Sequence, residues 1–205
     1  MTIWTIAWVI GAFLVGSAPP AIAVGRLFGV DVLREGTGNP GQSNVNDLVG
    51  WYGAALVFVL DVGVGALSAL TPLWAHAGVE TAAASAVSTI VGRTFSPWLG
   101  FRGGRGQLAA LASAVALIPS AGVIWLAIFA VGAALRRLAL ANLVGLATLW
   151  VTAWLVYRTW WSVAYAVSIG VMGVVRRLMG SPDGGSFDRM QRLLYDRERD
   201  LGGRC

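Results

Sequence analysis

A polar, glycine-rich stretch in an otherwise apolar sequence has the composition of an anion site. This first stretch reads Gly36-Thr37-Gly38-Asn39-Pro40-Gly41-Gln42-Ser43-Asn44-Val45. Its glycines allow successive backbone N–H groups to converge on one point, which forms a concavity suited to a phosphate. The side chains of Thr37, Asn39, Ser43 and Asn44 add donors beside Gly38. The same residue types also build ordinary turns, so the surroundings must decide between the two interpretations.

A second polar stretch runs from Gly92 to Gly106 and holds Arg102 and Arg105 around Gly103-Gly104. Backbone donors and fixed cations that converge in this way suit a phosphoryl group. A positively charged loop that only fixes membrane topology is the alternative. The presence of both stretches favours a phosphate site, provided that they lie on the same side of the membrane.

The composition predicts an all-α integral membrane protein. Hydrophobic residues make up 57% and charged residues 12% of the 205 residues, and the mean hydropathy is +0.70. These values are too apolar for a soluble globular domain. All 15 basic residues are Arg, and they lie in loops and a tail, where membrane lipid headgroups are the expected partners and nucleic acid is not. The single Cys205 excludes an intramolecular disulfide and a thiol metal cluster.

Apolar runs predict about seven transmembrane helices. The runs are residues 3–24, 51–74, 81–91, 107–134 (divided near Pro119 into two short or tilted helices), 140–157 and 160–175. Pro19-Pro20 predicts a break or kink near the inner end of the first run, which places Ser17 at the membrane surface.

The distribution of Arg sets the expected orientation. With the N-terminus outside and the C-terminus in the cytoplasm, every Arg except Arg158 lies on the cytoplasmic side, as the positive-inside rule requires. Both polar stretches then share the cytoplasmic face. The expected domains are a polytopic membrane domain, 1–175, and an Arg-rich cytoplasmic tail, 176–205, in which residues 187–201 form a surface helix.

The motifs resemble those of a known family. The first stretch is similar to the Gly-Ser-Gly-Asn-(Ile/Pro)-Gly-Ala-Thr-Asn-Val signature of the bacterial acyl-phosphate:glycerol-3-phosphate acyltransferases, the PlsY family. Gly100-Phe101-Arg102-Gly103-Gly104-Arg105-Gly106 resembles that family's Gly-Phe-Lys-Gly-Gly-Lys-Gly loop. Leu60-Asp61 and Gly16-Ser17 match further motifs in the family's order.

The resemblance implies an enzyme of the bacterial inner (plasma) membrane. It would transfer a fatty acyl group from an acyl phosphate to the 1-hydroxyl of glycerol 3-phosphate, giving lysophosphatidic acid for phospholipid synthesis without a metal or another cofactor. The first stretch and Arg102 to Arg105 would surround the phosphates. Asp61 would be a buried functional acid, or would brace the bundle against an Arg. Ser17, Arg93 and Asn142 are further candidates.

Several positions depart from the family pattern. The first motif of the family continues to an Arg, and this chain has Asp47 at that position. The family's lysine on the second helix is replaced here by Val64. The family's Gly-His before the second loop is replaced here by Gly92-Arg93. A further family motif, His-x-x-Asn-Ile-x-Arg-Leu, aligns with Val171-Met172-Gly173-Val174-Val175-Arg176-Arg177-Leu178, in which neither the His nor the Asn is present. The only His, His76, is expected on the outer face, so no imidazole base serves the two stretches, and no catalytic residue is assigned.

Other functions follow from these departures. An acyl phosphate is already activated, so orientation and charge stabilisation can drive transfer without a His. The alternatives are transfer to a different acceptor, or a non-catalytic relative that binds a phosphorylated lipid or partners an active enzyme. A transporter is the weakest alternative, because the sequence has no evident inverted repeat and its polar stretches lie at a surface. The sequence makes no prediction of acyl chain length or oligomeric state.

Overall fold

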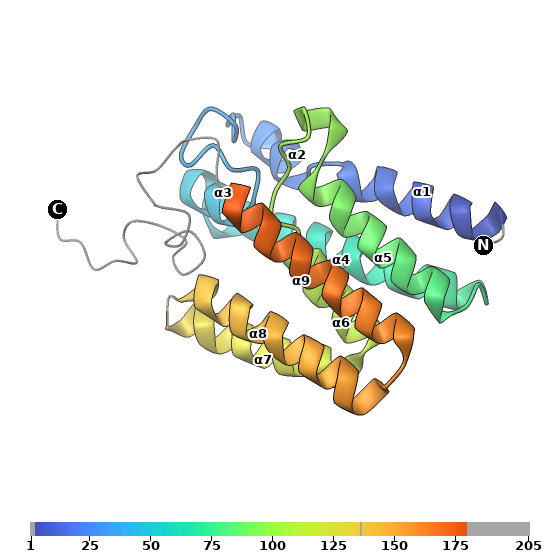
Figure 1. Cartoon of the computed structure of the whole chain (residues 1–205). Coiled ribbons are helices and arrows are strands. Elements are labelled where there is room, and N and C mark those ends of the chain that lie inside the picture. The colour runs from blue at the N-terminus through green and yellow to red at the C-terminus, as the bar shows by residue number, and fades with distance from the viewer. Residues whose placement is uncertain (1–2, 136, 180–205) are drawn as a thin grey trace.

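The computed structural model describes residues 3–135 and 137–179, and this part of the chain is helical and contains no strand (Figure 1). The helices are α1 (Ile3–Ser17), α2 (Pro20–Leu27), α3 (Gln42–Val49), α4 (Trp51–Trp74), α5 (Val79–Thr94), α6 (Gln107–Leu117), α7 (Pro119–Ala134), α8 (Leu138–Thr152) and α9 (Trp160–Met179). A 3-10 turn, η1 (Pro97–Leu99), follows α5, and a π-helical turn, η2 (Ala153–Tyr157), continues α8.

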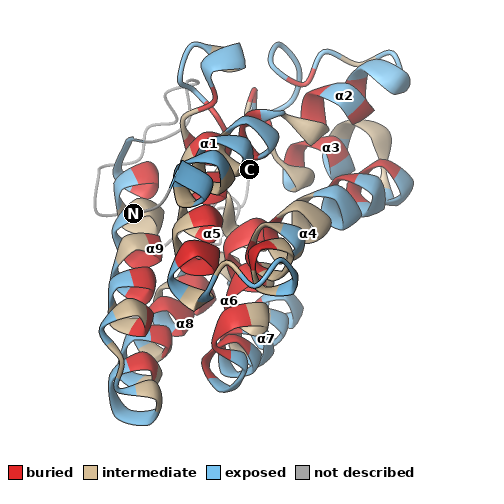
Figure 2. Ribbon diagram, turned by 90° about the vertical axis from the view of Figure 1, so that its right-hand side faces the viewer, coloured by how far each residue is buried: buried red, intermediate tan, exposed pale blue. Residues whose placement is uncertain are grey.

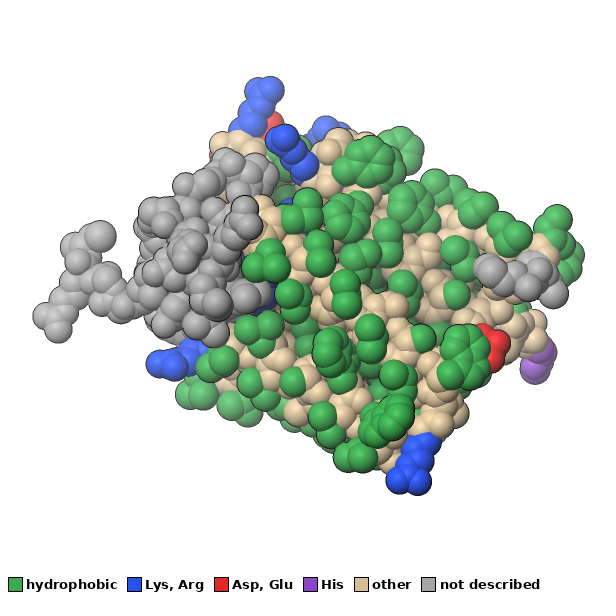
Figure 3. Space-filling model, viewed as in Figure 1, with side chains coloured by type: hydrophobic (Ala, Val, Ile, Leu, Met, Phe, Trp, Pro, Cys, Tyr) green, Lys and Arg blue, Asp and Glu red, His purple; other side chains and the backbone are tan. Residues whose placement is uncertain are grey.

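The apolar runs form helices of membrane-spanning length. Four segments of the described chain are long and apolar enough to cross a membrane, namely Ile3–Leu27, Trp51–Trp74, Leu138–Tyr157 and Trp160–Met179. The helices α6 and α7 are shorter and also apolar. Hydrophobic side chains are spread over the described part of the face seen in Figure 3, as a surface against lipid requires. The chain is therefore an all-α integral membrane protein, while the number of seven spans and their orientation remain predictions.

Two predicted helix breaks at prolines are confirmed. The first apolar run divides into α1, which ends at Ser17, and α2, which begins at Pro20. The long run of residues 107–134 divides between Leu117 and Pro119. Proline suits the first position of a helix, because its fixed φ fits the helix and its missing N–H would be unpaired there in any case.

Several helix boundaries differ from the expectation. The helix α5 continues to Thr94, whereas the expected span ended at residue 91. The second half of the first stretch is not a loop, because Gln42 begins the short helix α3, where the Gly41 carbonyl accepts hydrogen bonds from the N–H groups of Asn44 and Val45. The last helix continues to Met179 and so includes Arg176 and Arg177, which were expected in the tail. Both side chains are buried against the bundle. The expected surface helix at 187–201 lies outside the described residues.

Small residues let α1 and α5 approach closely along their length. A Cβ atom on Gly16 would collide with the backbone of Thr89, and one on Gly92 would collide with the carbonyl of Phe13. The Thr89 hydroxyl donates to the Ala12 carbonyl at 3.2 Å. This small-residue packing is typical of membrane helices. It places the end of α1 beside the end of α5, where the second stretch begins (Figure 1).

The core lies around α5. This helix contacts α1, α4, α6 and α9, and most of its residues from Thr81 to Thr94 are buried. Figure 2 shows the buried positions along α5 and α6 and the exposed positions on the outer faces of the surrounding helices. The side chains at the C-terminal end of α5 are therefore fixed in place by neighbouring helices.

Candidate functional site

The two polar stretches meet at a small pocket, as their pairing in the sequence predicts. Its lining residues come from the break between α1 and α2, from the first stretch and from the second stretch: Ser17, Pro19, Pro40, Arg93, Ser96, Leu99, Gly103 and Gly104. Gly104 lies close to the first stretch, since an added Cβ would be 3.1 Å from the carbonyl oxygen of Pro40. Glycine at this position lets the two stretches come together.

Asn44 holds the first stretch in shape. It is 1% exposed, and its Oδ1 accepts a hydrogen bond from the N–H of Thr37 at 2.8 Å. Its Nδ2 donates to the carbonyls of Val32 at 2.9 Å and Glu35 at 3.1 Å. Because these two bonds use both amide hydrogens, Asn44 offers neither to a ligand. Its expected role as a direct phosphate donor is therefore replaced by a role in folding the stretch.

The other candidates of the first stretch lie outside the pocket lining. Thr37 and Ser43 are exposed, Asn39 is half-buried, and Gly38 is buried with a φ of 63°. The positive φ explains why glycine occupies this position. Pro40 is the residue of this stretch that reaches the pocket.

Gly103 has both of its backbone groups engaged. Its N–H donates to the carbonyl of Thr94 at 3.1 Å, and its carbonyl accepts from Nη2 of Arg176 at 2.6 Å. A Cβ here would collide with the carbonyl of Arg93, so only glycine fits. The N–H of Gly103 is thus already bonded within the chain, and its contact with a phosphate stays a prediction. Gly104 is buried, and its N–H donates no hydrogen bond within the described part of the chain.

The two arginines of the second stretch differ in exposure. Arg102 is exposed, whereas Arg105 is half-buried. Arg105 lies close enough to Arg176 for the two like charges to interact. Sequence reasoning missed Arg176, because the family motif leaves this position unspecified and its burial depends on how α9 packs against the second stretch.

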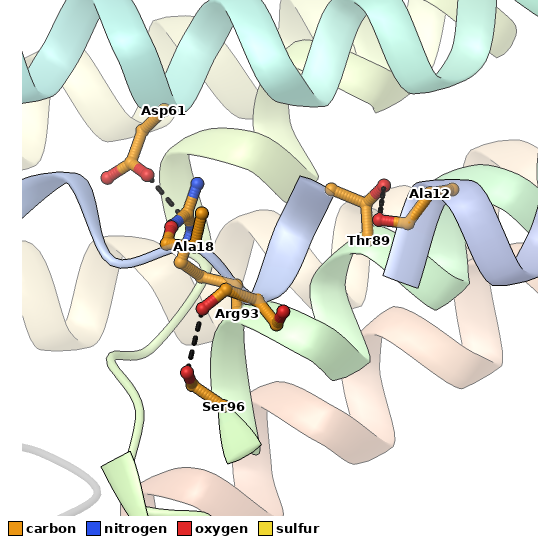
Figure 4. A network of polar contacts seen from close by, with 7 residues as sticks. Ala12, Ala18, Asp61, Thr89, Arg93 and Ser96 are labelled. Carbon is orange, nitrogen blue, oxygen red and sulfur yellow. Dashed lines mark hydrogen bonds and ion pairs between the residues drawn. The ribbon is translucent and has the colours of Figure 1, made fainter. Parts of the chain in front are cut away.

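Arg93 and Asp61 form a buried ion pair in the pocket wall. The Nε atom of Arg93 lies 3.0 Å from Oδ1 of Asp61, and the two side chains are 6% and 16% exposed. Nη1 of Arg93 also donates to the carbonyl of Ala18, between α1 and α2. Figure 4 shows Arg93 extending from α5 toward Asp61 on α4. The bracing arrangement considered for Asp61 is therefore present, and it joins three elements around the pocket.

Ser17 connects α1 to the second stretch. Its hydroxyl donates to the carbonyl of Leu14 at 2.7 Å and accepts from Nε1 of Trp98 at 2.9 Å. The hydroxyl of Ser96 donates to the carbonyl of Ser17 at 2.7 Å. Ser17 is 1% exposed and lines the pocket. Its hydrogen bonds place it as an anchor for residues 96–98.

Asn142 and His76 lie away from the pocket lining. Asn142 belongs to α8, where it is 1% exposed and its Oδ1 has no hydrogen bond within the described range. His76, the only His of the sequence, is exposed between α4 and α5. Figure 3 shows its side chain at the end of the molecule opposite α3. No imidazole is therefore available beside the pocket.

The pocket is suited to bind an anion. Gly104 and the Arg93 side chain line the pocket and bring an N–H donor and a cation to it, and Arg105 follows Gly104 directly in the chain. In the part of the chain that the structure describes, no group of three or more His, Cys, Asp or Glu side chains is placed to hold a metal ion. Binding and orientation of a phosphate are what this arrangement can do.

Comparisons with known proteins agree on one family. The family model described as glycerol-3-phosphate acyltransferase matches residues 6–178. A relative from Dehalococcoides mccartyi named glycerol-3-phosphate acyltransferase 2 is 34% identical over 136 residues, which are 66% of this chain and 65% of the relative. This alignment thus covers just under two thirds of the relative's length.

Two solved structures share the fold. The crystal structure of PlsY, described as an integral membrane glycerol 3-phosphate acyltransferase in its glycerol 3-phosphate form, matches with a TM-score of 0.77 and 25% identity. The match covers 84% of this chain and 88% of that chain. The lysophosphatidic acid form of PlsY matches with a TM-score of 0.76 and 25% identity, over 84% of this chain and 87% of that one.

Proposed function

Because this chain belongs to the glycerol-3-phosphate acyltransferase family, we propose that it transfers a fatty acyl group from an acyl phosphate to glycerol 3-phosphate. The product would be lysophosphatidic acid, an early intermediate of phospholipid synthesis. The observation that carries the proposal is the pocket at which the two glycine-rich stretches meet, since it collects donors and positive charge for a phosphate. The glycerol 3-phosphate and lysophosphatidic acid forms of PlsY support the choice of acceptor and product.

The proposed reaction needs no cofactor. The 1-hydroxyl oxygen of glycerol 3-phosphate attacks the carbonyl carbon of the acyl phosphate, and the bond from that carbon to the phosphate oxygen breaks. Inorganic phosphate leaves with the electron pair of this bond, and the hydroxyl proton passes to the phosphate of the acceptor. The protein's part is to align the two substrates and to stabilise the negative charge, which can account for much of a rate enhancement.

Individual residues have distinct proposed roles. Arg105 and the N–H of Gly104 hold the donor phosphate, while Thr37, Asn39 and Ser43 orient the acceptor. Arg93 adds positive charge to the pocket wall but stays paired with Asp61. A guanidinium remains protonated and so does not shuttle protons. Asp47 is exposed on α3, where the family resemblance leads one to expect a cation, and it would weaken the hold on the acceptor phosphate.

Binding without turnover is the second candidate function. The positions of α9 that match the family's His and Asn are Val171 and Val174. Loss of an oriented acid–base group typically lowers a rate by about 10² to 10⁴. A relative that holds a phosphorylated lipid, or partners an active enzyme, would retain the pocket and tolerate these valines.

The setting of the proposed enzyme is the bacterial inner membrane. The chain is a multi-pass membrane protein, and we assign it seven spans with the N-terminus outside and both stretches facing the cytoplasm. This orientation would place the pocket where glycerol 3-phosphate and acyl phosphate are present.

Product analysis tests the proposed function. The purified protein in lipid is given radiolabelled glycerol 3-phosphate with either palmitoyl phosphate or palmitoyl-coenzyme A. We expect labelled lysophosphatidic acid with palmitoyl phosphate alone. No lysophosphatidic acid from palmitoyl phosphate, with retained binding of the donor, would support the non-catalytic function and contradict the enzymatic one.

A further inference from the structure

We propose that Arg176 is a positioning residue that aims the Gly104 N–H into the pocket, through the peptide group that joins Gly103 to Gly104. The inference rests on the proposed function only in naming the donor phosphate as the anion that this N–H receives. Arg176 falls at the unspecified position before the Arg in the family's His-x-x-Asn-Ile-x-Arg-Leu motif.

The contact with Arg176 fixes one side of this peptide group. Nη2 of Arg176 donates to the carbonyl oxygen of Gly103 at 2.6 Å, and the Arg176 side chain is buried. The carbonyl of Gly103 and the N–H of Gly104 belong to the same planar unit, and in a trans peptide they point in opposite directions. An arginine that holds the carbonyl on one side therefore turns the N–H toward the other side.

The residues around the peptide leave it little freedom to rotate. The N–H of Gly103 is bonded to the carbonyl of Thr94 at 3.1 Å, and Gly103 packs directly against the carbonyl of Arg93. On the other side, Gly104 lies against Pro40 of the first stretch. The peptide is thus held at Gly103 by α5, at its carbonyl by α9 and at Gly104 by the first stretch.

The N–H of Gly104 is the hydrogen-bond donor of this peptide group. Gly104 is buried and lines the pocket, and its N–H donates to nothing within the described residues. A buried N–H without a partner is rare in native proteins, so this N–H is suited to an acceptor such as a bound anion. A cation on the carbonyl also polarises the peptide and makes its N–H a stronger donor to an anion.

Arg176 reaches this contact from the far end of the sequence. It lies near the C-terminal end of α9, and its hydrogen bond to Gly103 places that end against the chain between α5 and α6. The same end of α9 brings its charge near Arg105. The last helix thereby supports the second stretch, which otherwise has a single short turn, η1, of regular structure before α6.

Binding of hexadecylphosphonate, which carries a long chain and a phosphate-like group but cannot transfer an acyl group, tests the proposal. Affinity is measured on the full chain in lipid nanodiscs for wild type, Arg176→Met, Arg176→Lys and Arg26→Gln. Arg26 is an exposed arginine at the end of α2, so its loss controls for one positive charge. We expect Arg176→Met to bind roughly 10- to 100-fold more weakly, the range that follows from loss of one charge-assisted hydrogen bond.

Arg176→Lys keeps a cationic donor for the Gly103 carbonyl, and we expect it to bind within about threefold of wild type while Arg26→Gln is unchanged. Should Arg176→Met fail to fold, Arg176→Gln takes its place, and the same loss of affinity for hexadecylphosphonate is expected. Wild-type affinity in the neutral Arg176 variants would overturn the proposal, and so would the absence of binding by wild type.

Kinetics separate a positioning role from a purely structural one. In turnover with palmitoyl phosphate, Arg176→Met should raise the KM for palmitoyl phosphate while leaving the KM for glycerol 3-phosphate unchanged. An equal rise in both KM values would contradict the proposal. Because phosphonate binding needs no turnover, a wild-type protein that binds hexadecylphosphonate but makes no lysophosphatidic acid would overturn the proposed function and leave this inference standing.

Discussion

Nε of Arg93 lies 3.0 Å from Oδ1 of Asp61, so that a cation of α5 and an acid of α4 are paired inside the bundle. The same guanidinium donates to the carbonyl of Ala18 at the break between α1 and α2. A buried charge is tolerated better when an opposite charge lies beside it. The pair therefore holds the pocket wall together and is not available as a proton shuttle.

Removal of one partner of this pair should destabilise the fold strongly. Asp61→Asn or Arg93→Met leaves the other charge buried and unpaired, and we expect each to lower the free energy of unfolding by about 3–5 kcal/mol. Unfolding by SDS in mixed micelles, followed by the fluorescence of the 10 Trp residues, measures this change. The double variant Asp61→Asn with Arg93→Met should lose much less than the sum of the two single losses. Additive losses, within about 0.5 kcal/mol, would show that the two side chains do not interact.

Substitution of Gly103 should distort the second stretch. Gly103→Ala places a Cβ against the carbonyl of Arg93, where the backbone must shift, and overpacking of this kind costs about 1–3 kcal/mol. We expect a lower unfolding midpoint and loss of acyl transfer. Gly11→Ala is the matched control, because nothing lies within 4 Å of an added Cβ at that position of α1. Equal activity of the two variants would contradict the packing described for Gly103.

Much of the fold was predictable because lipid imposes a simple requirement on the sequence. A membrane helix must be long and apolar, so the hydropathy of residues 51–74 gave the bounds of α4 directly. Prolines marked the breaks before α2 and α7. The helix α3 was missed because eight mostly polar residues carry neither the length nor the apolar pattern of a membrane helix.

The candidate site was predictable in its location but not in its contacts. The glycine-rich composition identified the two stretches that form the pocket. The sequence could not show that Asn44 turns its amide inward, since the loop carbonyls that it binds lie as many as 12 residues away. It could not show the contact of Arg176 with Gly103 either, because 73 residues separate them and only the packing of α9 brings them together.

Substitution of Asn44 should loosen the first stretch. In Asn44→Asp, the side chain still accepts the hydrogen bond from the N–H of Thr37. Its second oxygen replaces the Nδ2 donor, so the hydrogen bonds to the carbonyls of Val32 and Glu35 are lost. Each lost bond costs about 1–3 kcal/mol, so we expect trypsin to cleave after the exposed Arg34 at least about tenfold faster. Asn46→Asp, at an exposed position of α3, is the control and should be cleaved at the wild-type rate. An unchanged rate in Asn44→Asp would show that these bonds do not hold the stretch.

The orientation in the membrane can be tested with single cysteines. In a Cys205→Ser background, Asn46→Cys marks the end with the pocket and His76→Cys marks the connection between α4 and α5. Both positions are exposed. We expect a membrane-impermeant maleimide to label His76→Cys in intact spheroplasts and Asn46→Cys only after permeabilisation. The reverse pattern would place the pocket outside the cell and contradict the proposed topology.

The most direct test of the central claim is release of inorganic phosphate from palmitoyl phosphate by the protein in lipid, with and without glycerol 3-phosphate. Wild type and Arg26→Gln should release phosphate in a manner that depends on glycerol 3-phosphate, while Arg105→Ala should lose both the release and the binding of palmitoyl phosphate. This result would show that the pocket between the two stretches binds the donor for transfer. Wild-type release by Arg105→Ala would contradict the account, because the donor phosphate would then be held elsewhere.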